Sequence, residues 1–287
     1  MKTLKSIALF IAPHGLVKKY IKLKSGQKTD YRLLDQRKAE EIANELDTKS
    51  TKQQSKPLDY NYVVDYFVDT FHIDKSHILS GSIGPKNCDR MVYTILEHFD
   101  KSRIIGLNIG NFLGVAFSYI LSRVVHNNNE STLISVDPNI PHRGIENLED
   151  KFIASLGAFN LEDNSLIING YSLNKNLSND GVTFNHYDPE KFYNQENGCT
   201  GVLQKLVYLG VEKLNFILLD GNHHSEYLQQ EMKICSQLLQ SGGILFLDDI
   251  DENWKLLKTS ALNFLKENES VFSELYYDGR ILALKKK

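Results

Sequence analysis

From Arg103 onward, short apolar runs alternate with stretches of helical spacing, and this alternation constrains the fold more than any other feature of the chain. Such alternation indicates βαβ units around a parallel sheet. Five strands are predicted at residues 104–109, 133–136, 165–170, 214–219 and 244–247, with the glycine pair 242–243 ending the helix before the last of them. We therefore expect an α/β, Rossmann-like sheet that is mostly parallel.

The C-terminal stretch VFSELYYDGRILALKKK contains two more strand-like runs, joined by Asp278 and Gly279. An Asp-Gly pair between strands predicts a two-residue type I′ turn, so the sheet should end in an antiparallel hairpin. The usual dinucleotide-binding sheet has six parallel strands and does not end in this way.

Three further regions are distinguished by composition. Residues 1–57 form an apolar and basic segment followed by a polar linker, and residues 58–100 form a helical lead-in to a domain that spans 58–287. Residues 174–198 are rich in Asn, Asp and Gly and read as an irregular insertion. The apolar run within residues 4–24 is too short to span a bilayer, so we expect this segment to dock on the domain or contact a partner, with peripheral contact to a membrane surface as the alternative.

Charge and cysteine content narrow the class of protein. The net charge is -3, which argues against a nucleic-acid binder and favours a small-molecule partner. The three cysteines, Cys88, Cys199 and Cys235, are widely spaced and form no CxxC pair, as expected of a protein in the reducing cytoplasm. The sequence leaves open whether the chain forms a homo-oligomer.

Open parallel sheets bind ligands outside the carboxyl ends of their strands, so the residues that follow each strand are the candidates for a site. In NIGNFLG after the first strand, Gly110 and Gly114 allow close backbone approach, although a tight strand-to-helix turn would need the same glycines. Asp137 after the second strand could accept both ribose hydroxyls of a nucleoside, or could serve as a turn aspartate. Tyr171 and Ser172, after the third strand, could flank an adenine.

Carboxylates follow the fourth and fifth strands. Asp220, Asp248 and Asp249 should meet at one rim, where they must share a cation or take up a proton. Oxygen ligands of this kind suit Mg²⁺, Mn²⁺ or Ca²⁺, whereas Asp249 could instead cap the next helix. His223, at the first turn of the helix after Asp220, could accept a proton from a substrate hydroxyl. We expect His224 to be an ordinary polar residue at the helix start.

The motifs RIIGLNIGNFLG, LISVDPN, NFILLDGNHHSEYLQQEM and SGGILFLDDID resemble those of class I S-adenosylmethionine-dependent methyltransferases, over residues 78–287. More narrowly they resemble bacterial metal-dependent O-methyltransferases that modify sugars and other small molecules. The resemblance implies that the methionine part, ribose and adenine of S-adenosylmethionine are bound by Asn108, Gly110, Asn111, Gly114, Asp137, Tyr171 and Ser172. It also implies that Mg²⁺ or a similar divalent cation is held by Asp220, Asp248 and Asp249.

The implied activity is methyl transfer to a hydroxyl of a small acceptor, sugar-like or glycan-linked, with metal assistance and with His223 and Asp220 as catalytic residues. Asn108 and Asn222 stand where such proteins usually carry acidic residues, which lowers the negative charge of the site. Two alternatives stay open. One is a metal-independent methyltransferase with His223 as base, and the other is a non-catalytic partner protein that keeps the methyltransferase fold.

Overall fold

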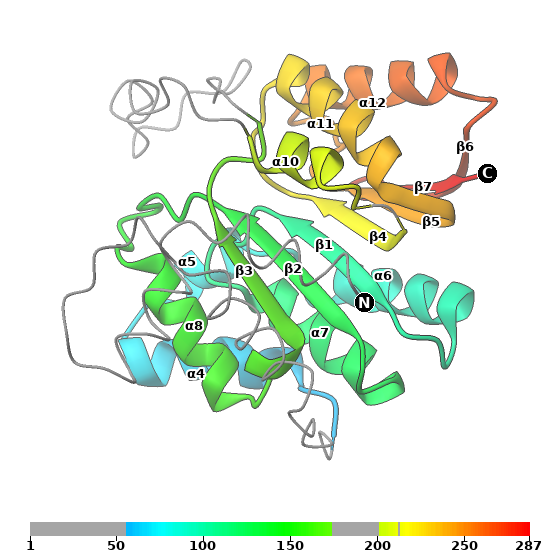
Figure 1. Ribbon diagram of the computed structural model, residues 1–287. Coiled ribbons are helices and arrows are strands. Elements are labelled where there is room, and N and C mark those ends of the chain that lie inside the picture. Colours follow the sequence, from blue (N-terminus) through cyan, green and yellow to red (C-terminus); the bar gives the residue numbers. More distant parts are fainter. Residues whose placement is uncertain (1–55, 174–200, 212) are drawn as a thin grey trace, which may run out of the picture.

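A computed structural model describes residues 56–173, 201–211 and 213–287 of the 287-residue chain (Figure 1). Nearly all of the predicted N-terminal segment 1–57, including the proposed contact region 4–24, lies outside the described residues. The predicted insertion 174–198 also lies outside them.

The described chain is built around one seven-stranded sheet with the order β3-β2-β1-β4-β5-β7-β6. Strands β1 to β5 pair in parallel, whereas β7 runs antiparallel to both β5 and β6. The strands are β1 (Ile105–Ile109), β2 (Thr132–Asp137), β3 (Ser165–Asn169), β4 (Leu214–Leu219), β5 (Leu239–Leu247), β6 (Phe272–Tyr277) and β7 (Leu282–Lys286). The predicted fold class is confirmed.

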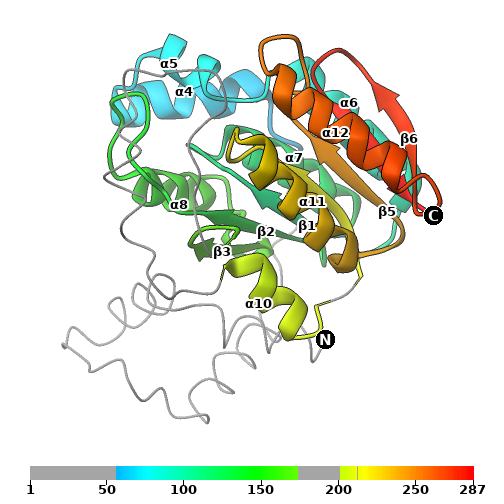
Figure 2. The same cartoon turned by 90° about the horizontal axis from the view of Figure 1, so that it is seen from above.

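Helices cover both faces of the sheet (Figures 1 and 2). One face carries α4 (Tyr60–Phe71), α5 (Lys75–Ser80), α6 (Pro85–Phe99), α7 (Val115–Asn127) and α8 (Leu148–Ala158), and the other carries α10 (Val202–Tyr208), α11 (Ser225–Leu238) and α12 (Lys255–Glu267). A short 3₁₀ helix, η1 (Glu162–Asn164), precedes β3. Since both faces are covered, β4 is buried along its whole length and reads as a continuous apolar run. Within the described residues, no helix has both the length and the apolar character needed to cross a bilayer.

The register of the parallel strands decides where the candidate side chains lie. Ile109 is paired with Val136 on one side and with Leu219 on the other, and Leu219 is paired with Leu247. The residues that follow are therefore level at the carboxyl edge, namely Gly110, Asp137, Asp220 and Asp248. Backbone hydrogen bonds continue across this row, from Gly110 N to Val136 O and from Asp220 N to Ile109 O, at 3.0 and 2.9 Å.

Two local predictions are wrong. The glycine pair 242–243 does not end a helix, because α11 stops at Leu238 and β5 begins directly at Leu239 and contains both glycines. The C-terminal turn is not type I′ with Asp278 and Gly279 at its centre. Asp278 instead pairs with Ile281, its N donating to Ile281 O at 3.2 Å, so that Gly279 and Arg280 form the centre.

The backbone angles of this turn explain the difference. A type I′ turn needs positive φ at both central residues, but only Gly279, at +94°, has it. The Asp278 carboxylate holds the turn by accepting from Arg280 N at 3.1 Å and from Ile281 N at 2.8 Å. Asp278 is thus the residue that caps the turn, and Arg280 projects from its tip.

Candidate active site

A cavity of about 340 Å³ opens at the carboxyl edge of the sheet. It runs from the ends of β2 and β3 past the β1 loop to the ends of β4 and β5. Most of the predicted site residues line it, namely Gly110, Asn111, Asp137, Tyr171, Ser172, Asp220, His223 and Asp249, whereas Asn108, Gly114 and Asp248 are not part of the lining. Most of the residues that follow the parallel strands therefore line one continuous cavity.

The loop after β1 is fixed by Asp137. One carboxylate oxygen accepts from Asn111 N at 2.5 Å and from Phe112 N at 3.3 Å, and the other accepts from Asn139 N at 2.6 Å. Burial raises the pKa of Asp137, and these three amides only partly oppose it. Asp137 therefore organises the loop as well as facing the cavity.

Gly110 is required where the β1 loop meets β4. Its φ is +82°, and a Cβ atom there would lie 1.8 Å from the carbonyl oxygen of Asp220. Gly114 is required for packing, since a Cβ would lie 2.1 Å from the ring of Phe152. Asn108 is buried and donates to Gly110 O at 2.6 Å and to Asn111 Oδ1 at 3.0 Å, so it shapes the loop from beneath.

A buried polar cluster lies beneath the β3 end of the cavity. Ser172 Oγ is 2.5 Å from Glu231 Oε1 and 3.0 Å from the hydroxyl of Tyr227, which accepts from Leu173 N at 3.2 Å. Burial raises the pKa of Glu231 to about 8, although the Ser172 hydrogen bond lowers it. The cluster fixes the segment that bears Tyr171 and Ser172. Sequence patterning gave no sign of Glu231, which occupies a core position of α11.

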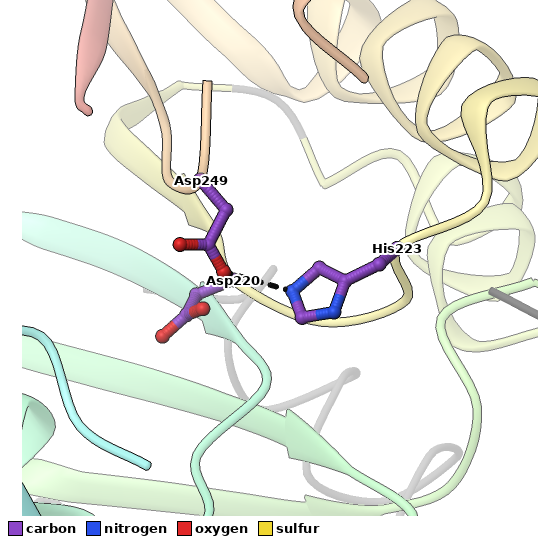
Figure 3. A group of neighbouring side chains, drawn as sticks. All are labelled: Asp220, His223 and Asp249. Atoms are coloured by element: carbon purple, nitrogen blue, oxygen red, sulfur yellow. Dashed lines mark ion pairs between the residues drawn. The ribbon is translucent and has the colours of Figure 1, made fainter. Parts of the chain in front are cut away.

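Asp220, His223 and Asp249 converge at the β4 and β5 end of the cavity (Figure 3). His223 Nε2 lies 3.0 Å from Asp249 Oδ2, and the imidazole stacks on Trp254 with ring centroids 4.2 Å apart. Helix α11 begins at Ser225, so His223 lies in the loop before the helix and not in its first turn. His224 is the N-cap, its Nδ1 accepting from Glu226 N, as expected of a residue at the helix start.

The pKa values of the two carboxyl groups in this group are shifted in opposite directions. Burial raises the pKa of Asp220 well above its usual range, and the charges of Asp248 and Asp249 raise it further. The pKa of Asp249 is lowered overall. Burial alone would raise it, but the hydrogen bond and charge of His223, together with the nearby arginines, have the larger effect. Asp249 has a φ of +56°, a strained angle for a non-glycine residue, and strain of this kind clusters at functional sites.

Asp248 is held away from the cavity by Arg280. Arg280 Nε and Nη2 donate to the two carboxylate oxygens of Asp248 at 2.7 and 2.6 Å, and Nη2 also lies 3.3 Å from Asp249 Oδ1. The Asp248 side chain is 0% exposed and that of Arg280 is 38% exposed. The three predicted carboxylates do meet at one rim, but a guanidinium from the C-terminal turn supplies the positive charge beside two of them.

The remaining donor atoms could hold a divalent cation, but the ligand residues differ from the three predicted aspartates. Asp220, His223 and Asp249 each offer one ligand atom, and these atoms lie within 4.8 Å of one another. Asp248 is absent from this group because Arg280 holds both of its oxygens. A set with one imidazole nitrogen and two carboxylate oxygens suits Mn²⁺ and related transition metals better than it suits Mg²⁺.

Comparison with known proteins identifies the family. Residues 107–250, about half of the chain, match the model of a family described as methyltransferase domain. The chain belongs to this methyltransferase family. The matched region begins within β1 and ends just after β5, so it contains the β1 loop and the ends of β2, β4 and β5.

Solved structures of methyltransferases share the fold. The O-methyltransferase from Bacillus cereus in complex with S-adenosylhomocysteine is 11% identical, with a TM-score of 0.50, and the match covers 94% of this chain and 97% of that one. An S-adenosylhomocysteine-bound methyltransferase from Podospora anserina is 10% identical, with a TM-score of 0.52, 91% coverage of this chain and 100% of that one. No curated protein matches the chain. The class I methyltransferase fold that the sequence predicted is thus confirmed.

Two arginines of the cavity were missed by the sequence analysis. Arg280 and Arg143 both line the cavity, but neither follows a parallel strand directly. Arg280 stands in the DGR turn of the predicted hairpin, and its place next to Asp278 and Gly279 is the one signal that could have drawn attention to it. Arg143 lies in an irregular loop between β2 and α8, where periodicity carries no information.

Proposed function

We propose that the protein transfers a methyl group from S-adenosylmethionine to a hydroxyl of a small acceptor. The observation that carries this proposal is a single cavity that joins Asp137 and the β1 loop to the group formed by Asp220, His223 and Asp249. The family match supports methyl transfer, and the two solved neighbours with S-adenosylhomocysteine bound support the cofactor.

The cofactor would lie across the ends of β3, β2 and β1. Asp137 would bind the ribose, Tyr171 and Ser172 would flank the adenine, and Gly110 and Asn111 would border the methionine part. Asn108 and Gly114 would act indirectly by shaping and packing the loop, since neither lines the cavity. The methyl donor would then point towards the ends of β4 and β5.

His223 is the proposed proton acceptor. The O–CH₃ bond forms as the S–CH₃ bond breaks, and the hydroxyl proton must leave the acceptor oxygen. With Nε2 facing the Asp249 carboxylate at 3.0 Å, a neutral His223 that carries its proton on Nε2 keeps Nδ1 as the nitrogen that can take the proton of the acceptor. Asp249 would hold the ring in place and stabilise the imidazolium that results, as carboxylates do for catalytic histidines in other enzymes.

A divalent cation is the second part of the proposal. Asp220, His223 and Asp249 would hold it, and when bound it would lower the pKa of the acceptor hydroxyl. A neutral imidazole carries one N–H, so if Nε2 bound a cation the proton would sit on Nδ1, and Nδ1 could then not accept the proton of the acceptor. Cation binding through Nε2 and the pairing of Nε2 with Asp249 are therefore competing states of one site. The metal-independent alternative is favoured by that pair and by the salt bridge between Arg280 and Asp248.

We propose a sugar-like or glycan-linked acceptor. The cavity end that carries the catalytic group is lined by polar side chains and by one large aromatic side chain, Trp254, a combination that suits a hydroxyl-rich ring. The proposal for the acceptor rests on this chemistry and on the resemblance of the sequence motifs to sugar-modifying enzymes.

The decisive experiment combines cofactor binding with methyl transfer. Calorimetry with S-adenosylhomocysteine tests the cofactor, and methyl-labelled S-adenosylmethionine tests transfer to a panel of sugars and glycosides. We expect His223→Ala to lower transfer by about 10²- to 10⁴-fold, the usual effect of losing a general base, without weakening cofactor binding. His224→Ala is the matched control and should keep full activity, because His224 caps α11 and does not line the cavity.

Chelation separates the two mechanisms. Loss of transfer in EDTA that Mn²⁺ restores would support the metal site, whereas transfer that survives EDTA but not His223→Ala would select the metal-independent enzyme. Absence of S-adenosylhomocysteine binding at millimolar concentration would contradict the proposal and favour a non-catalytic partner protein.

A further inference from the structure

Arg143 is a cation in the cavity wall without an anionic partner among the described residues. Its guanidinium makes one long hydrogen bond, from Nη1 to Ser80 Oγ at 3.2 Å. Its Nε is buried and finds no acceptor in the described structure. A buried donor without an acceptor costs about 1–3 kcal/mol, and more when it is charged, so a ligand atom that accepts from Arg143 would remove this cost.

The packing around Arg143 fixes it in this position. A Cβ atom on Gly81 would lie 3.1 Å from Arg143 Nε and 2.6 Å from the ring of Phe112, so the absence of a side chain at position 81 makes room for both groups. Phe112 in turn contacts His142 edge to face, with ring centroids 5.6 Å apart. Arg143 has a φ of +52°, another strained angle beside the cavity.

Arg143 differs in this respect from the other arginine of the cavity. Arg280 is neutralised by Asp248 and Asp249, with donor to acceptor distances of 2.6 to 3.3 Å. Arg143 has no such pair within the described part of the chain, and its positive charge contributes to the lowered pKa of Asp249 across the cavity. The field of Arg143 therefore extends into the space that a ligand would fill.

We propose that Arg143 binds a carboxylate of the ligand that fills the cavity. The guanidinium is a planar fork that matches a carboxylate, and it is already held in place and partly dehydrated, so little ordering is lost on binding. The inference rests on the proposed function for the identity of the ligands. Two sources offer the same chemistry, namely the amino-acid end of the cofactor and an acidic group of the acceptor, such as that of a uronic acid.

Calorimetry on the full chain distinguishes the two sources. S-adenosylhomocysteine is compared with 5′-methylthioadenosine, which has the same nucleoside and thioether but no carboxylate. Protein saturated with S-adenosylhomocysteine is then titrated with D-glucuronate and with D-glucose. Each titration uses the wild type, Arg143→Gln, Arg143→Lys and the control Arg103→Gln, which removes an equal charge from an exposed residue that does not line the cavity.

If Arg143 binds the carboxylate of the cofactor, Arg143→Gln should lower the affinity for S-adenosylhomocysteine at least ~10-fold, as expected for loss of charge-assisted hydrogen bonds. The affinity for methylthioadenosine should not change. If Arg143 binds a carboxylate of the acceptor, Arg143→Gln should leave the affinity for S-adenosylhomocysteine unchanged and lower the affinity for glucuronate at least ~10-fold. The affinity for glucose should not change. Arg143→Lys should fall between, since it keeps the charge and loses the fork.

Unchanged affinity of Arg143→Gln for both carboxylates would overturn the inference while leaving the proposed function intact. Failure of the wild type to bind either nucleoside would instead refute the proposed function. Equal thermal unfolding of wild type and variants shows that a loss of affinity does not come from misfolding.

Discussion

Replacement of Arg280 by alanine tests the charge balance of the site. The substitution leaves the Asp248 carboxylate fully buried without its two charge-assisted hydrogen bonds of 2.7 and 2.6 Å. Breaking a buried pair by removing one partner costs about 3–5 kcal/mol. Because the guanidinium is 38% exposed, water screens part of the interaction, and we expect a loss of about 2–4 kcal/mol in the free energy of unfolding at pH 7.

The loss should depend on pH in a defined direction. Burial raises the pKa of Asp248 in the folded protein, and Arg280 opposes this rise. A carboxyl group with a raised folded pKa stabilises the fold most at low pH, and this contribution is lost as the pH rises from the unfolded to the folded pKa. Without Arg280 the folded pKa is higher still, so the deficit of Arg280→Ala should be larger at pH 8 than at pH 5.

Urea unfolding followed by circular dichroism measures this deficit at both pH values. Arg103→Ala is the control, because Arg103 is exposed and, within the described part of the chain, donates to the backbone carbonyl of Glu130 alone. The double variant Asp248→Asn with Arg280→Gln removes both charges and should recover much of the stability. A deficit below about 1 kcal/mol, or one that shrinks as the pH rises, would refute the reasoning.

Three further substitutions test other parts of the site. Gly110→Ala should cost at least about 2 kcal/mol of stability, measured by urea unfolding, because of its positive φ and the 1.8 Å clash with Asp220 O. Asp137→Asn should lower the affinity for S-adenosylhomocysteine, measured by calorimetry, at least ~10-fold, since an asparagine side chain cannot accept from all three backbone N–H groups of the loop. Glu231→Gln should match the wild type at pH 4 and below, and exceed its unfolding free energy at pH 8. The wild-type carboxyl, with a folded pKa of about 8, loses stability over this window.

The sheet and its functional edge could be predicted because both depend on local patterns. Apolar runs that end at Ile109, Val136 and Leu219 marked strands, and parallel pairing necessarily places the residues after them at one edge. The convergence of Asp220 and Asp249 followed from that geometry without any knowledge of side-chain contacts.

The partners of these carboxylates could not be predicted in the same way. Arg280 lies 32 residues after Asp248, in the C-terminal turn. The position of Arg280 in that turn depends on whether Asp278 is a central residue of the turn or pairs with Ile281. Likewise, sequence spacing placed His223 on a helix, but His224 took the N-cap position and left His223 in the loop beside Asp249. Helix capping and ion pairs between residues far apart in the sequence are decided by tertiary packing.

The position of β7 has a consequence for the order of folding. In space β7 lies between β5 and β6, although β6 precedes it in sequence. A hairpin with a tight turn forms in about 1–10 μs, whereas pairing with β5 must close a longer loop that contains α12, so we expect β6 and β7 to dock on β5 as a preformed unit. Arg280, at the tip of this hairpin, reaches Asp248 only when docking occurs. Completion of the sheet and neutralisation of the acidic rim would then be a single kinetic event.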